Sequence, residues 1–147
     1  MISRSALVVL AMLGLATADA AAADIPAFYQ VSEAELAGAP GTLIRSEPWQ
    51  IESPYKASVF RILYRSTGAN GEPIAVSGSV TIPDNIEAPT TGRGIVAWAH
   101  GTSGVVRKCA PSLRDVPYHS VPGIQDLLAR GYVVVATDYQ GLGAEGV

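Results

Sequence analysis

The sequence is poor in the residues that define several classes of protein. Its 147 residues include a single cysteine, Cys109, which cannot form a disulfide framework within the chain. The two histidines, His100 and His119, form no cluster with metal-ligand spacing, so we expect no metal site. Charged residues make up 16% of the chain and the net charge is -3, whereas a nucleic-acid partner requires a clustered basic surface. Zinc enzymes, disulfide scaffolds and nucleic-acid modules are therefore poor hypotheses.

Long apolar runs are also scarce. The longest, residues 6–16, has eleven residues, and a membrane-spanning helix needs about 20. Arg4 precedes this run and small residues follow it over 18–23, as in a secretory signal peptide with its cleavage site. We therefore predict a signal peptide over residues 1–23 and one partial domain over residues 24–147. The product would be secreted, extracellular or periplasmic, with no membrane span after cleavage.

The first half of the mature chain predicts an antiparallel hairpin. Residues 59–66 are rich in aromatic and β-branched side chains, which favour a strand. The pair Asn70-Gly71 is typical of a tight turn. Residues 74–82 then alternate between apolar and small polar side chains, which predicts a second strand whose apolar face is buried.

A short helix and a loop precede the hairpin in this prediction. Ser32 and Glu35 have the spacing of a capping box, which marks the start of a helix. Residues 39–58 contain three prolines and little periodicity, so we predict mostly loop there, with a short strand near Leu43 and Ile44.

The second half predicts a parallel strand-helix-strand unit. Residues 95–99 and 132–136 are apolar at every position, which is typical of strands covered on both faces. Between them lie three apolar residues at helical spacing: Ile124, Leu127 and Leu128. Ser120 would cap this helix and Gly131 would end it. The hairpin would thus lead into a parallel sheet, which makes the fold class α/β.

The candidate site is the turn His100-Gly101-Thr102-Ser103-Gly104. It follows the predicted strand 95–99 at its carboxyl end, where open α/β sheets place their active sites. A His-Gly pair followed by small residues resembles the turn that supplies an oxyanion hole in α/β-hydrolases. Such a turn directs backbone N–H groups at a carbonyl oxygen that becomes negative during acyl transfer. The alternative is an ordinary glycine-rich turn.

Other site patterns are weaker. Gly141, Gly143 and Gly146 match the G-x-G-x-x-G pattern of dinucleotide-binding proteins, which also requires a helix and a later acidic residue. No serine has the G-x-S-x-G setting of a nucleophile elbow, so no catalytic triad is visible. Neither a serine nor an acid is suggested as a partner for His119, which we interpret as a surface residue. The long segment 101–119 is interpreted as a solvated charged loop.

Several segments together resemble the amino-terminal half of secretory lipases, a branch of the α/β-hydrolases. The segments, in order, are 40–47, 61–67, 76–80, 98–104, 109–112 and 128–143. The resemblance implies an exported lipase or esterase that hydrolyses carboxylic esters, including acylglycerols, through a serine nucleophile and without a cofactor. It also implies that residues 101–103 donate one oxyanion-hole group. The expected ligand is a small-molecule or lipid ester.

The resemblance further implies a missing carboxyl-terminal half. The family's serine, acid and histidine follow the position of Val147, so we expect none of the triad here and expect the 147-residue chain alone to be inactive. Cys109 resembles a family cysteine that pairs with one in that half. The fold would be truncated before the nucleophile strand, leaving residues 95–99 as an exposed edge strand. Two alternatives stay open, a non-catalytic exported binding protein that pairs through this edge and, less favoured, a dinucleotide-binding fragment.

Overall fold

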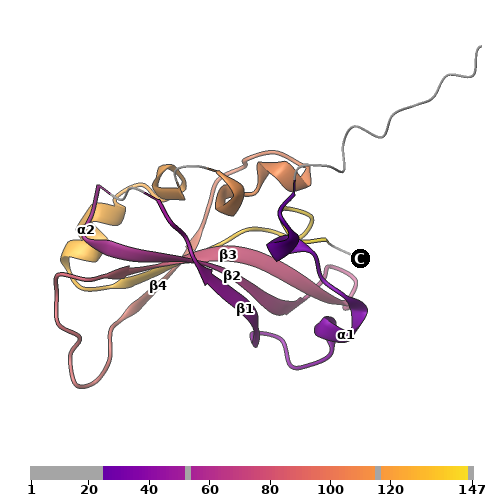
Figure 1. The fold of residues 1–147 in the computed structure, drawn as a ribbon, viewed down its shortest axis with the longest axis horizontal. Coiled ribbons are helices and arrows are strands. Elements are labelled where there is room, and N and C mark those ends of the chain that lie inside the picture. The colour runs from indigo at the N-terminus through magenta and orange to yellow at the C-terminus, as the bar shows by residue number, and fades with distance from the viewer. Residues whose placement is uncertain (1–24, 52–53, 115–116, 146–147) are drawn as a thin grey trace, which may run out of the picture.

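The computed structural model describes residues 25–51, 54–114 and 117–145. Its frame is a five-stranded sheet in the order β1-β2-β3-β5-β4. The strands are β1 (Leu43–Pro48), β2 (Ala57–Thr67), β3 (Pro73–Pro83), β4 (Ile95–Ala99) and β5 (Val133–Thr137). The α-helices are α1 (Glu33–Leu36) and α2 (Ile124–Ala129), and the 3-10 turns are η1 (Ala27–Tyr29), η2 (Arg107–Cys109), η3 (Pro111–Leu113) and η4 (Pro117–Ser120). Figure 1 shows α2 and the turns after β4 on one face of the sheet. The predicted signal peptide lies outside the described residues.

The predicted hairpin is confirmed. Strands β2 and β3 pair antiparallel from Ala57 opposite Pro83 to Thr67 opposite Pro73. In the connecting turn Gly71 takes a φ of +88°, which glycine adopts without steric cost. The capping box is also confirmed, since the Ser32 N–H donates to the Glu35 carboxylate at 2.9 Å at the start of α1.

The predicted short strand near Leu43 and Ile44 is confirmed as β1, which extends beyond the prediction to Pro48. This strand has six residues and pairs antiparallel with β2, with a register shift between Leu43 and Arg45. Its sequence includes Arg45, Ser46, Glu47 and Pro48, so it lacks the apolar alternation of an independent strand. The backbone pairing with β2 therefore specifies β1 more than its own side chains do.

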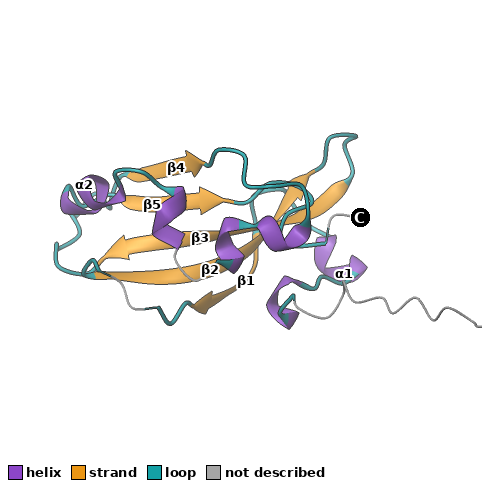
Figure 2. Cartoon of the chain, turned by 90° about the horizontal axis from the view of Figure 1, so that it is seen from above, coloured by secondary structure: helices purple, strands orange, loops and turns teal. Residues whose placement is uncertain are grey.

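The parallel strand-helix-strand unit is confirmed, with two corrections. Strands β4 and β5 pair in parallel from Ile95 opposite Val133 onward. Figure 2 shows both arrows pointing the same way with α2 at their starting end. Strand β4 is not covered on both faces, because Ile95 is 69% exposed, and its expected position at the edge of the described sheet is confirmed. Helix α2 begins after Gly123, which has a φ of +76°, so Ser120 is not its cap.

The alternation of β3 is confirmed, and its predicted apolar face is buried at Ile74, Val76 and Gly78 and half-buried at Val80 and Ile82. The opposite face is buried as well, at Ser77, Ser79 and Thr81, which the alternation did not predict. The face with the small hydroxyl side chains lies on the α2 side, because Ser79 and Thr81 pair with the buried Ala136 and Val134 of β5. Small side chains there allow the chain after β5 to pack directly on the sheet.

The segment between β4 and α2 is more ordered than the predicted solvated loop. It forms the three short turns η2, η3 and η4. Arg107 is half-buried, and its guanidinium donates to the Gly143 carbonyl at 2.9 Å and pairs with Glu145 at 2.6 Å. Across the described residues, no helix has both the length and the apolar character needed to span a bilayer.

Candidate active site

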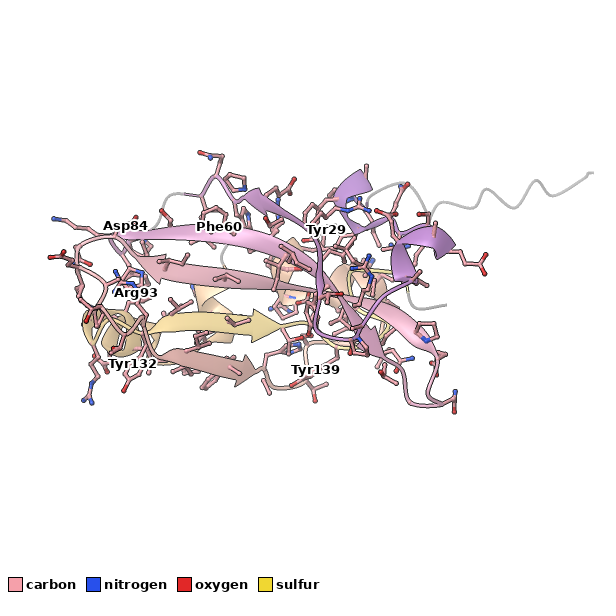
Figure 3. All side chains as sticks on the ribbon, turned by 90° about the horizontal axis from the view of Figure 1, so that it is seen from below. Tyr29, Phe60, Asp84, Arg93, Tyr132 and Tyr139 are labelled. Atoms are coloured by element: carbon pink, nitrogen blue, oxygen red, sulfur yellow. The ribbon has the colours of Figure 1, made fainter. Side chains whose placement is uncertain are left out.

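The turn over residues 100–104 begins where β4 ends. His100 is 6% exposed, and its ring stacks on that of Tyr139 at 4.2 Å between centroids and 22° between planes. The Tyr139 hydroxyl donates to the His100 carbonyl oxygen at 2.5 Å. Figure 3 places Tyr139 just beyond the arrowheads of β4 and β5. Two strand ends, far apart in sequence, therefore meet at this turn.

The imidazole of His100 has a defined proton position. Its Nδ1 lies 2.5 Å from the Gly101 carbonyl oxygen. A carbonyl oxygen only accepts hydrogen bonds, so Nδ1 carries the proton and donates it. In the neutral ring Nε2 is then an acceptor, and this buried atom has no partner within the described part of the chain.

The turn combines free backbone donors with open space. Within the described ranges, the N–H groups of Gly101, Thr102 and Ser103 donate to no other group. A cavity of about 260 Å³ is lined by these residues, His100, His119 and Arg114, among others. A larger cavity beside α1 includes none of the turn's residues. Donors without partners beside a cavity are what oxyanion stabilisation requires, and this role of residues 100–104 stays a prediction.

The end of the turn packs against Cys109. Gly104 has a φ of +134°, and a Cβ there would lie 2.3 Å from the Cys109 sulfur. Only glycine therefore allows the turn to lie this close to η2. Cys109 is half-buried and its thiol is free in the described structure. Its pairing with a further cysteine stays a prediction.

A buried polar cluster beneath the site was not predicted from the sequence. Asp138 directly follows β5 and is 2% exposed. Its carboxylate accepts hydrogen bonds from Ser77 Oγ at 2.6 Å, Ser112 Oγ at 2.5 Å and the Ser112 N–H at 3.2 Å. Burial raises the pKa of Asp138, and the hydrogen bonds from Ser112 and Ser77 oppose this shift. Tyr29 extends the cluster by donating to the Ser112 carbonyl at 2.8 Å.

The cluster supports the structure and leaves no accessible nucleophile. Ser77 and Ser112 are 0% and 2% exposed and donate directly to Asp138 rather than to an imidazole. His119 is exposed, in agreement with its prediction as a surface residue. Asp138 lies 61 positions after Ser77 and 26 positions after Ser112 in the sequence. A local sequence motif cannot reveal contacts between residues so far apart. The available signal was an aspartate directly after an apolar strand, opposite a strand rich in serine.

The glycine-rich segment after β5 is packed into the protein. A Cβ on Gly143 would lie 2.3 Å from Ser77 Oγ, and the neighbouring Leu142 and Ala144 are buried. Gly143 also exchanges backbone and side-chain hydrogen bonds with Arg107. Gly141 and Gly143 lie in a turn without helix in the described residues, and Gly146 lies outside them. The packing of Gly143 explains this glycine without a dinucleotide.

The fold is that of part of an α/β-hydrolase, and the solved structures that it resembles include lipases and esterases. Candida antarctica lipase A in its closed state has a TM-score of 0.66 at 24% identity, over 79% of this chain and 29% of that chain. The rice cell wall degrading esterase LipA from Xanthomonas oryzae has a TM-score of 0.55 at 28% identity, over 72% of this chain and 31% of that chain. No protein-family model and no curated protein matches the chain. The chain thus spans about 30% of the length of these structures.

Proposed function

We propose that residues 24–147 are the amino-terminal part of an exported carboxylic-ester hydrolase of the secretory-lipase type. The observation that carries the proposal is the turn after β4, where three residues whose N–H groups have no partner in the described chain line a cavity. In ester hydrolysis a serine attacks the carbonyl carbon and a negative charge develops on the carbonyl oxygen. The N–H groups of Thr102 and Ser103 would stabilise that charge, each donor being worth about 2.7–4 kcal/mol in comparable enzymes.

The catalytic serine, acid and histidine would lie outside residues 1–147. The uncovered apolar face of the sheet supports this part of the proposal, because it needs further protein to bury it. Ile62, Tyr64, Ala97 and Val135 line a cavity of about 450 Å³ on that face. The matched parts make up only 29% and 31% of the two solved structures, which therefore contain a further part of this kind. On this proposal the 147-residue chain alone does not turn over esters.

The proposal is tested by Gly101→Ala in the intact protein that contains this segment. No atom lies within 4 Å of the Cβ position of Gly101, and its φ is not positive, so alanine fits without strain. The methyl group would occupy space beside the reacting carbonyl. We expect kcat for p-nitrophenyl butyrate to fall at least about tenfold with little change in KM or melting temperature. Unchanged turnover would remove the assignment of this turn.

Gly92→Ala is the matched control. Gly92 has a φ of +84° and no neighbour within 4 Å of its Cβ position, in the loop that leads into β4. Alanine there strains the backbone by about 1–2 kcal/mol but lies at the opposite end of β4 from the turn. The control should lower the melting temperature and leave kcat unchanged, the reverse of the result expected for Gly101→Ala.

The alternative of a non-catalytic exported binding protein has one supporting observation, the exposed edge at Ile95. The intact mass of the exported product distinguishes the two. A mass well above that of residues 24–147 supports a longer enzyme, and a product without residues 1–23 supports the signal peptide. A mass equal to that of residues 24–147 would overturn catalysis and favour binding through β4.

A further inference from the structure

Tyr139 contacts the turn at two points. Its ring stacks on His100, and its hydroxyl donates to the His100 carbonyl oxygen. We propose that Tyr139 is a positioning residue that holds the oxyanion turn in its working geometry, an inference that rests on the proposed ester hydrolysis. The residue does not line the cavity of about 260 Å³ beside the turn, so its effect would pass through His100.

The residues on both sides of Tyr139 are fixed to the sheet. Asp138 is held by Ser77 of β3 and by Ser112 of η3. The Gln140 side chain accepts from the Ala69 N–H at 3.1 Å and donates to Glu72 at 3.0 Å, in the turn between β2 and β3. Tyr139 is thus a ring on a short segment anchored at each end. Such an anchored ring can hold a neighbouring loop in one conformation.

The contacts of Tyr139 and His100 set the directions of two peptide groups. The described peptides are trans, so each N–H points away from the carbonyl of the same peptide group. The Tyr139 hydroxyl holds the His100 carbonyl, which directs the Gly101 N–H to the other side. His100 Nδ1 holds the Gly101 carbonyl and directs the Thr102 N–H in the same manner. Both carbonyl oxygens are occupied, so neither is free to turn toward a developing negative charge.

The activity test uses Tyr139→Phe and Tyr139→Leu in the intact protein, with p-nitrophenyl butyrate as the substrate. Phenylalanine keeps the stacked ring and removes the hydroxyl, so we expect kcat to fall about tenfold with KM within about twofold. Leucine removes both contacts and should lower kcat about a hundredfold. Tyr139 is 40% exposed, so neither change leaves a buried cavity, and the melting temperature should stay close to that of the parent.

Tyr132→Phe is the matched control. Tyr132 is 39% exposed and directly precedes β5, at the end of that strand opposite to Tyr139 (Figure 3). Loss of its hydroxyl should leave kcat and KM unchanged. Equal kcat in Tyr139→Phe and the parent protein would overturn the proposal, as would an equal loss in Tyr132→Phe.

A second measurement separates this inference from the proposed function. In a histidine-labelled sample of the intact protein, the ring resonances that disappear in His100→Gln are those of His100. Loss of the stacked ring in Tyr139→Leu should shift the His100 ring protons downfield, whereas Tyr132→Phe should not move them. If the parent protein hydrolyses no ester, the proposed function fails, and unmoved His100 resonances would refute the contact on their own. An active parent with unmoved resonances would overturn only the positioning role.

Discussion

Gly143→Ala tests whether the segment after β5 is packed against the sheet. Gly143 has a φ of +67°, and a new Cβ would lie 2.3 Å from Ser77 Oγ and 3.2 Å from Tyr29. Positive φ costs an alanine about 1–2 kcal/mol, and overpacking a filled site adds about 1–3 kcal/mol. We therefore expect the free energy of unfolding to fall by about 2–5 kcal/mol, because Ser77 must also move away from Asp138.

Gly141→Ala isolates the backbone part of this cost. Gly141 has a φ of +81° and no atom within 4 Å of its Cβ position, so it should lose only about 1–2 kcal/mol. Urea unfolding followed by the fluorescence of Trp49 and Trp98 measures both variants. The difference between them is the steric part, and Ser77→Ala should remove some of it in the double variant with Gly143→Ala. Equal destabilisation by the two glycine substitutions, or an additive double variant, would refute the packing.

Three further predictions concern the sheet and the buried cluster. Asp138→Asn tests the raised pKa: above the usual value of 3.8 the unfolded carboxyl ionises before the folded one. As the pH rises from 3.8 through the raised pKa of the folded carboxyl, the free energy of unfolding of the parent should therefore fall relative to that of the variant, as measured by urea unfolding. A difference between the two proteins that does not change with pH would contradict the raised pKa. Trp98→Phe removes the bond from its indole N–H to the Ser120 carbonyl at 2.7 Å, and should cost about 1 kcal/mol in the same assay. Ile95→Lys places a charge on the edge strand and should reduce the self-association of the chain in sedimentation experiments, and unchanged association would show that this edge is not the contact.

The elements with a strong local pattern were predictable from the sequence. The hairpin of β2 and β3 follows from β-branched strands around a turn with Gly71, and the parallel unit follows from two apolar runs around α2. The place of the turn at His100 followed from its position directly after β4. In each case neighbouring residues carry the information, so no distant contact was needed to predict the element.

The elements that depend on distant partners were predicted only in part. A short strand was predicted near Leu43 and Ile44, but the polar remainder of β1 up to Pro48 depends on its pairing with β2. Helix α2 begins directly after Gly123, which has a positive φ and stands in the cap position predicted for Ser120. The Asp138 cluster joins β3, η3 and the end of β5, which are adjacent only after the sheet has formed. Local patterns identify strands and helices but not which of their side chains meet.

The polar face of β3 links the fold to the candidate site. Alternation shows which residues share a face, but it does not show which face is covered. In this protein both faces of β3 are largely buried, and Ser77, on the face with small hydroxyl side chains, provides a donor for a buried carboxylate. That carboxylate belongs to Asp138, the residue before Tyr139. The hydrogen bond from Ser77 to Asp138 therefore holds the segment whose Tyr139 contacts the turn at His100. The cost of a polar core is thus offset by hydrogen bonds that hold the end of β5 against β3 beside the candidate site.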